Sequence, residues 1–306
     1  MKTVRKQPQV LRRIKKSSWL YVIFALPFVY YLVFHYAPLY GIVLAFKDFN
    51  IMKGIVGSPW VGFKHFDKFL LEPYFWKLVR NTLLISFYGL LWGFPAPILL
   101  AILLNEVGHQ KYKKFVQNVS YLPHFISTVV VCGMIVNIMG TDGLFDQMVK
   151  LFGGAPEKWL MEPKYFRTIY TASGVWQGTG WTSIIYLAAL SMVDEELYDA
   201  ALIDGANRGQ RIWYITLPAL LPTVSVMLLM NLGRIMTVGY EKILLLYNGS
   251  TYETADIIST YVYRRGILQA DFSYSTAIGL FQALISVILI VVSNQVSRKL
   301  SETSLW

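Results

Sequence analysis

Residues 194–222 form a charged segment between two long apolar runs, and their types and spacing suggest a specific task. Asp194 can cap a helix whose first turn carries Glu195 and Glu196, because carboxylates suit the positive end of a helix dipole. Gly205 permits the left-handed conformation that commonly ends a helix. Residues 210–217 predict a second short helix. Two short helices at a membrane surface are too small for a domain and indicate a docking site for another protein.

The sequence offers little for catalysis within the chain itself. It contains no Gly-x-x-x-x-Gly-Lys-Ser/Thr loop for nucleotide phosphates, no His-Glu-x-x-His pair and no Gly-x-Ser-x-Gly turn. The four histidines are scattered, and Cys132 lies inside an apolar run, where a small buried packing residue is expected. We therefore expect a chain that is not an enzyme, with no catalytic residue, metal site or cofactor of its own.

The elements that position the charged segment are membrane helices. The chain has 306 residues, of which 55% are hydrophobic and 15% are charged, whereas soluble proteins carry about 25% charged residues. The apolar residues gather in runs long enough to cross a bilayer. We predict an all-α bundle of six transmembrane helices at residues 19–46, 79–104, 115–139, 168–193, 218–240 (with an extension toward 247) and 275–296.

Basic residues set the expected orientation. The net charge of +10 comes largely from the tail 1–18, the Lys111, Lys113 and Lys114 cluster, and Arg298 with Lys299. The positive-inside tendency then places both termini and residues 194–218 in the cytoplasm, and this reading replaces nucleic-acid binding. The expected organisation is a basic tail (1–18), a first helix with its outer loop (19–78), a transmembrane core (79–297) and a short tail (298–306).

The charged segment carries a resemblance. Asp199-Ala200-Ala201, followed by Gly205 and the Ile-x-Leu-Pro ending at Leu217 and Pro218, resembles the cytoplasmic loop of binding-protein-dependent ABC importer permeases. That family has Glu where this chain has Asp199. A second block from residue 240 to 277 is similar to the carbohydrate uptake branch, the class of the maltose and glycerol-phosphate permeases. Within it, the residues from 26 to 41 and 62 to 63 look like LplB-type oligosaccharide permeases.

The resemblance implies a type I ABC importer permease (MetI-like) fold in a bacterial cell membrane. Its loop inserts as a rigid wedge into partner ATPases, which bind the ATP and Mg that this chain does not. Two ATP-binding subunits, a second permease, an extracytoplasmic sugar-binding protein, membrane lipid and an oligosaccharide are the implied partners. The residues expected to couple transport to ATP hydrolysis are Glu195, Glu196, Asp199, Ala200, Ala201, Asp204, Gly205, Leu217 and Pro218.

Polar residues within the later helices predict a substrate path. Asn231, Arg234, Val238 and Glu241 recur at steps of three and four, so a continuous helix would place them on one face. The other expected path residues, from the fourth and sixth helices, are Trp176, Gln177, Trp181, Gln282 and Ser286. The alternative is that these side chains bond to one another or to a partner permease.

Arg234 supports a sharper hypothesis. An ionisable group near the middle of a membrane is costly and usually faces a cavity or a partner. Arg234 would then favour an acidic oligosaccharide, and the alternative is an ion pair with Glu241 or with the partner subunit.

Two other classes of function stay open on the residues alone. An energy-independent channel or secondary sugar carrier would need no cytoplasmic wedge. A membrane-bound transferase acting on lipid-linked sugar would need an essential acid or base cluster.

Overall fold

Helices make up almost all of the computed structural model, which describes residues 17–300 (side chains 296, 297, 299 and 300 excepted). Over this range β-structure is limited to one isolated bridge between Lys47 and Trp60. The all-α prediction is therefore confirmed. Most of the predicted basic tail and the last six residues lie outside the described range.

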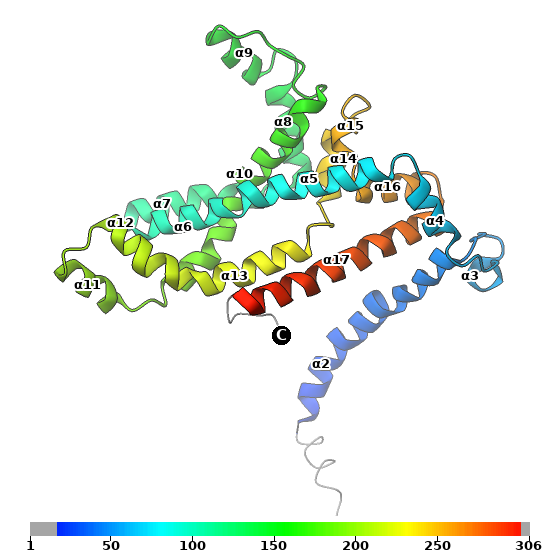
Figure 1. The fold of residues 1–306 in the computed structure, drawn as a ribbon, viewed down its shortest axis with the longest axis horizontal. Helices are drawn as coiled ribbons and strands as arrows, with labels where there is room; N and C mark the ends of the chain where they lie inside the picture. Colours follow the sequence, from blue (N-terminus) through cyan, green and yellow to red (C-terminus); the bar gives the residue numbers. More distant parts are fainter. Residues whose placement is uncertain (1–16, 301–306) are drawn as a thin grey trace, which may run out of the picture.

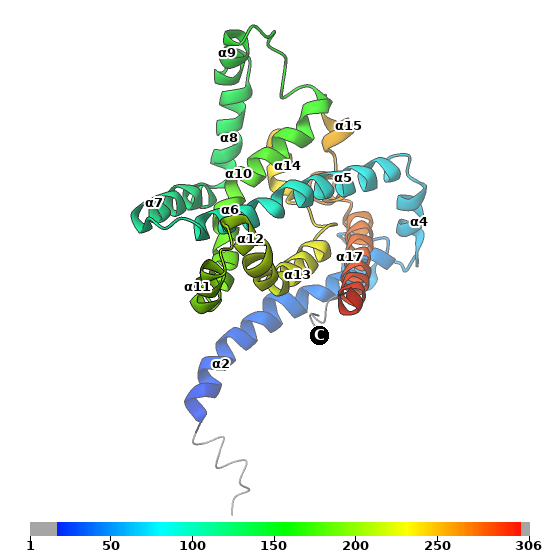
Figure 2. The same cartoon turned by 60° about the vertical axis from the view of Figure 1, so that its left-hand side comes forward.

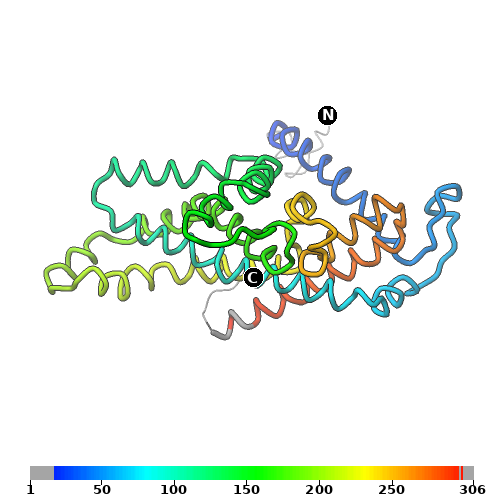
Figure 3. The backbone as a smooth tube through the Cα atoms, turned by 90° about the horizontal axis from the view of Figure 1, so that it is seen from above, coloured from blue at the N-terminus to red at the C-terminus, as the bar shows by residue number. Residues whose placement is uncertain are grey.

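The N-terminal quarter contains the first span and a compact loop. Its elements are α2 (Ser18–Tyr31), the π-helical turn η1 (Leu32–Tyr36), the 3-10 helix η2 (Ala37–Phe46), α3 (Gly54–Gly57) and α4 (Lys64–Leu71). Pro27 lies inside α2, and Pro38 lies at the start of η2, where the helix changes type. Seen from above, α2 lies outside the bundle, and its continuation η2 packs against α17 and α4 (Figure 3).

The middle of the chain supplies the central helices. They are α5 (Phe75–Gly93), α6 (Pro95–Asn105), α7 (Gln110–Tyr121), the 3-10 turn η3 (Leu122–Phe125), α8 (Thr128–Met139), α9 (Leu144–Leu151) and α10 (Pro163–Leu190). Helix α10 contacts α5, α6, α7 and α13, so it is the centre of the bundle. Helices α8 and α9 extend away from the long helices (Figure 1 and Figure 2).

The third span was predicted as one continuous helix, and this prediction is wrong. The structure breaks residues 115–139 into α7 and α8 at the η3 turn, which contains Pro123. Leu122, the residue before Pro123, still has helical dihedral angles, and the chain leaves the helix at Ile126, whose backbone is extended. Helix α8 then begins after the Ser127 cap. The segment 128–151, rather than 115–139, is long and apolar enough to span.

The last third of the chain holds the charged segment and two further long helices. Its elements are α11 (Glu195–Ile203), α12 (Arg208–Arg211), the π-helical turn η4 (Ile212–Thr216), α13 (Leu217–Gly233), α14 (Tyr240–Leu246), α15 (Tyr252–Ala255), α16 (Ile258–Tyr263), the π-helical turn η5 (Arg264–Leu268) and α17 (Phe272–Leu300). Helices α11 and α12 lie at one end of the molecule, and α3 and α4 lie at the opposite end (Figure 1).

By length and composition, five helices of the described chain could cross a membrane: Ser18–Phe46, Phe75–Asn105, Thr128–Leu151, Arg208–Gly233 and Phe272–Gln295. The predicted fourth span corresponds to α10, which is 28 residues long but more polar. Its polarity matches its position, because it packs among the other helices rather than against lipid alone. The chain is thus a multi-pass helical bundle, with a helix count close to the predicted six.

Buried apolar side chains form three clusters. The first joins α4, α5, α16 and α17 around Phe69, Leu78 and Tyr274. The second surrounds Cys132, which is buried as expected. The third joins α6, α10 and α13 at the end that carries α11. These clusters hold the helices together, and one cavity is lined by residues from α5, α10 and the segment following α13.

Candidate functional site

The charged segment begins as its sequence predicts. The Asp194 side chain accepts a hydrogen bond from the Glu196 N–H at 3.0 Å, and Glu195 and Glu196 occupy the first turn of α11. Gly205 has φ +77°, in the left-handed region. The Ala206 N–H donates to the Ala201 carbonyl at 2.8 Å, which closes the end of α11.

The predicted second short helix is wrong as a separate element. Helix α12 begins after the Asn207 cap and continues through η4 into α13. The Asn207 side chain accepts a hydrogen bond from the Gln210 N–H, and the Asn207 N–H donates to the Gln210 side chain. The Leu217 N–H bonds to the Ile212 carbonyl across a π-helical turn, and Pro218 follows at once. The wider turn lets the helix run through a proline that lacks a donor. Residues 208–233 therefore form one continuous rod that connects the charged segment to the bundle.

Two contacts fasten α11 and α12 to the bundle. The Tyr198 hydroxyl lies 3.0 Å from the Thr216 hydroxyl, and the Arg211 guanidinium lies 4.0 Å from the Glu106 carboxylate. Behind α11 lies a cavity of about 540 Å³. Its lining includes Glu195 and Asp199 from α11, with Lys113, Arg208 and Arg211 opposite.

The outer face of this element is apolar in part. The side chains of Leu202, Ile203, Trp213 and Tyr214 are exposed. A group of large exposed apolar side chains at the tip of a protein is typical of a surface that another protein covers. The element thus combines an exposed apolar face with a short polar connection to the bundle.

A cavity of about 630 Å³ with charged lining residues lies beside the end of α13. Its walls come from α5, α10, the end of α13 and the segment 234–242. Three of its lining residues are charged: Arg234, Glu241 and Lys242. This volume is in the range of small-molecule and cofactor sites, about 300–1,000 Å³.

The predicted fifth span is interrupted at this cavity. Helix α13 ends at Gly233, and α14 begins at Tyr240. Side chains from other helices satisfy the freed carbonyls: Ser86 of α5 donates to Ile235, and Gln282 of α17 donates to Met236. Such irregular backbone is stable inside a membrane protein only where protein or a water-filled cavity surrounds it.

The interruption corrects the predicted helical face, because Asn231, Arg234, Val238 and Glu241 do not lie on one helix. The break nevertheless brings all four to the same cavity, together with Gln177 of α10. Arg234 and Glu241 are exposed, and the described residues form no ion pair with either side chain. The ion pair with Glu241, which was one alternative for Arg234, is therefore not formed in the structure.

Four of the expected path residues lie elsewhere. Trp176 lines a separate cavity of about 590 Å³ with Tyr88, Trp92 and Arg167. The Trp181 ring stacks on His124 with centroids 4.6 Å apart. Gln282 is buried and bound to the α13–α14 break, and the Ser286 hydroxyl donates to the Gln282 carbonyl at 3.0 Å.

Sequence reasoning missed Lys242 and Tyr170. Lys242 lies four residues after Val238 and eleven after Asn231, so even a continuous helix would have kept it close to the predicted face. In the structure, the Lys242 ammonium lies 5.5 Å from the centroid of the Tyr170 ring, and both residues line the cavity. A signal was present in principle, because a lysine inside an apolar run at membrane depth is unusual.

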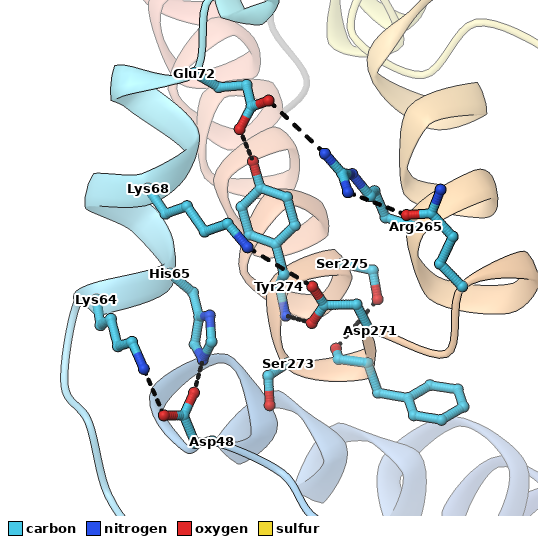
Figure 4. Close-up of polar contacts among 12 residues, drawn as sticks. Asp48, Lys64, His65, Lys68, Glu72, Arg265, Asp271, Ser273, Tyr274 and Ser275 are labelled. Atoms are coloured by element: carbon cyan, nitrogen blue, oxygen red, sulfur yellow. Dashed lines mark hydrogen bonds and ion pairs between the residues drawn. The ribbon is translucent and has the colours of Figure 1, made fainter.

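At the opposite end, a polar network joins two segments that the sequence assigns to separate loops (Figure 4). Glu72 accepts a hydrogen bond from Tyr274 at 3.3 Å and lies 3.7 Å from Arg265. Lys68 lies 3.9 Å from Asp271. Lys64 is bound to Asp48, and this hydrogen bond is the main reason that the pKa of the Asp48 carboxyl is lowered.

Comparisons with known proteins agree with this architecture. Residues 93–302 match the family model described as "Binding-protein-dependent transport system inner membrane component". The chain is 41% identical to the polygalacturonan/rhamnogalacturonan transport system permease protein YteP of Bacillus subtilis, over 98% of this chain and 94% of that one. It is 40% identical to protein LplB of the same organism, over 96% of this chain and 92% of that one.

Solved structures support the same assignment. The chain is similar to a bacterial ABC transporter involved in the import of the acidic polysaccharide alginate, with TM-score 0.89 and 40% identity over 96% of this chain and 100% of that one. A second structure of the alginate transporter holds an alginate pentasaccharide-bound periplasmic protein. By the family match and by these relatives, the chain belongs to the family of binding-protein-dependent transport system inner membrane components, and it is a multi-pass permease subunit.

Proposed function

We propose that this chain is the permease subunit of an ATP-driven importer that moves an acidic oligosaccharide across a bacterial cell membrane. The single observation that carries the acidic preference is the cavity of about 630 Å³, whose charged lining consists of two cations and one carboxylate. The relatives are consistent with it, because two are described by polygalacturonan or alginate transport. A polyuronate chain carries one carboxylate on each sugar ring, so a net positive path suits it.

The α11–α12 element is the proposed contact with ATP-binding subunits. Its exposed Leu202, Ile203 and Trp213 offer an apolar face, and the rod 208–233 leads from it directly to the Arg234 break. A displacement of this element would therefore reach the cavity as rigid-body motion. ATP and Mg would be bound by two partner subunits, and this end of the molecule would face the cytoplasm together with both termini.

The opposite end is the proposed contact with an extracytoplasmic sugar-binding protein. The network of Glu72, Arg265 and Asp271 joins the 47–77 and 248–274 segments into one surface. A second permease subunit would complete the path, because Arg234 in the wall of the cavity is exposed in this chain. An energy-independent carrier would not require the α11–α12 element, and a transferase would require an acid or base cluster of its own.

The test is uptake by the assembled transporter in proteoliposomes. Oligogalacturonate and a neutral oligosaccharide of the same length are supplied with ATP inside and loaded binding protein outside. The proposal expects ATP-dependent uptake of the acid, with the Arg234→Gln variant losing more uptake of the acid than of the neutral sugar. Equal loss for both sugars would remove charge recognition, and uptake without ATP would favour a carrier.

A further inference from the structure

A buried ammonium group is left without an anionic partner in the wall of the cavity. Lys242 is 8% exposed, and its Nζ is buried without a hydrogen-bond partner among the residues that the structure describes. Its contact is with the face of the Tyr170 ring, 5.5 Å from the centroid. The neighbouring Cys132 thiol points to the backbone carbonyl of Lys242, at 3.9 Å, rather than to a carboxylate.

Such an arrangement is costly unless something completes it. Removing an ammonium from water without an anion is unfavourable, and attraction to a ring face offsets only part of that cost. Glu241, the next residue, is exposed and makes no ion pair with Lys242. The Lys242 ammonium therefore lacks an anionic partner among the described residues, so an anion from outside them would stabilise it.

The cavity offers room for that anion. Lys242 and Arg234 line it together, and the carboxylate of Glu241 is the only negative group among the lining residues, so the lining has a formal excess of one positive charge. Gln177 of α10 and Asn231 of α13 also line the cavity, and amide side chains can hydrogen-bond sugar hydroxyls. A carboxylate attached to a sugar ring matches both the charge and the amides.

We propose that Lys242 binds the carboxylate of a uronate residue as the sugar passes through the cavity, with Tyr170 holding the ammonium in place. This proposal rests on the function proposed above and names the residue that selects for charge. Lys242 contributes more to binding the carboxylate than Arg234 does, because a buried charge interacts in a low-dielectric surrounding. An exposed charge is screened by water and salt. Arg234 then attracts the anion, and Lys242 decides whether it is retained.

The experiment measures binding by the complete assembly, purified in lipid nanodiscs without the binding protein. The probes are labelled tetragalacturonate and its full methyl ester, which has the same length and no charge. Lys242→Met should weaken binding of the acid by about tenfold or more, the usual effect of losing a charged hydrogen-bond partner. It should change binding of the ester by less than about threefold. Lys242→Arg should restore part of the preference for the acid.

If Lys242→Met does not assemble, two further measurements test the role of Lys242. The Glu241→Gln variant should bind the acid more tightly, because it removes the only carboxylate of the lining. In the unmodified assembly, the preference for acid over ester should survive about 0.5 M salt, since a buried charge is screened weakly. A preference that vanishes in salt would assign recognition to the exposed Arg234 instead.

The proposal is overturned if Lys242→Met assembles and keeps the preference of the unmodified protein for the acid. In that case Lys242 is a packing residue or pairs with a carboxylate of the partner permease, while ATP-driven uptake of the acid would still support the proposed function. Absence of ATP-driven uptake by the unmodified assembly would remove the proposed function itself.

Discussion

Gly180 is the point at which α10 and α7 approach most closely. A Cβ at this position would overlap the backbone carbonyl of Ser120, whereas a Cβ at Gly178, on the same helix, would meet nothing within 4 Å. Backbone atoms cannot yield as a flexible side chain can, so the helices would have to separate.

We predict that Gly180→Ala lowers stability by about 1–3 kcal/mol, the usual cost of overpacking. Gly178→Ala should leave stability unchanged or raise it slightly, because alanine favours the helix. Thermal unfolding of the purified protein in one detergent compares the two variants directly. Equal unfolding temperatures for the pair would show that the α7–α10 contact is looser than the structure indicates.

Position 205 requires glycine for a different reason. Nothing lies within 4 Å of a Cβ built there, but its φ of +77° is unfavourable for residues other than glycine. Gly205→Ala should therefore destabilise the end of α11 by about 1–2 kcal/mol. We expect weaker co-purification with the ATP-binding subunits, while Gly209→Ala, in the helical α12, should co-purify normally. Normal co-purification of both variants would argue against a role of this turn in assembly.

These local features were open to sequence reasoning because they depend on neighbouring residues. The Asp194 cap and the Gly205 turn follow from hydrogen bonds within a few positions of the chain. The set of cavity residues was found only in part. Lys242 was missed, and Gln282 was misplaced because its side chain donates to the Met236 carbonyl, which only the α13–α14 break leaves free.

At the scale of elements, the α13–α14 break is set by distant helices. The carbonyls of Ile235 and Met236 receive hydrogen bonds from Ser86 and Gln282, which lie on α5 and α17. Periodicity in residues 218–247 predicts a longer helix. The break depends on Ser86 and Gln282, which lie outside that stretch, so the stretch alone could not predict it. The interruption of the third span was likewise not predicted, although Pro123, a residue that often interrupts helices, lies within it.

We predict that Gln282→Met destabilises the protein by about 1–3 kcal/mol, because a buried carbonyl loses its donor while side-chain volume changes little. Ser286→Ala is the matched control, since its hydroxyl donates to the Gln282 carbonyl within α17 and the helix keeps its shape without it. Amide hydrogen exchange over residues 234–240 should become faster in Gln282→Met and stay unchanged in Ser286→Ala. Unchanged exchange in both would mean that Ser86 alone holds the break.

At the scale of the whole molecule, the two ends are built differently. The α11–α12 end is joined to the bundle by a continuous rod and two polar contacts, which suits an element that moves as one body. The opposite end is joined by many contacts across the chain, including residues more than 200 positions apart. The cavity is bordered by the α13–α14 break, so a movement of the rod 208–233 would change it while the opposite end stays fixed.

Ser273 is the residue by which that fixed end holds the first span. This buried hydroxyl accepts a hydrogen bond from the Phe49 N–H at 2.9 Å and donates to the Lys47 carbonyl at 2.6 Å. Ser273→Ala removes the partner of the Phe49 N–H and leaves the Lys47 carbonyl with only the His65 ring, so residues 47–60 should loosen by about 1–3 kcal/mol. Thr276→Val on the same helix is the control, because it loses only a bond to the Phe272 carbonyl within α17. Limited proteolysis should cut residues 47–60 faster in Ser273→Ala than in Thr276→Val, and equal cutting would show that the ion pairs of Figure 4 suffice to hold the first span.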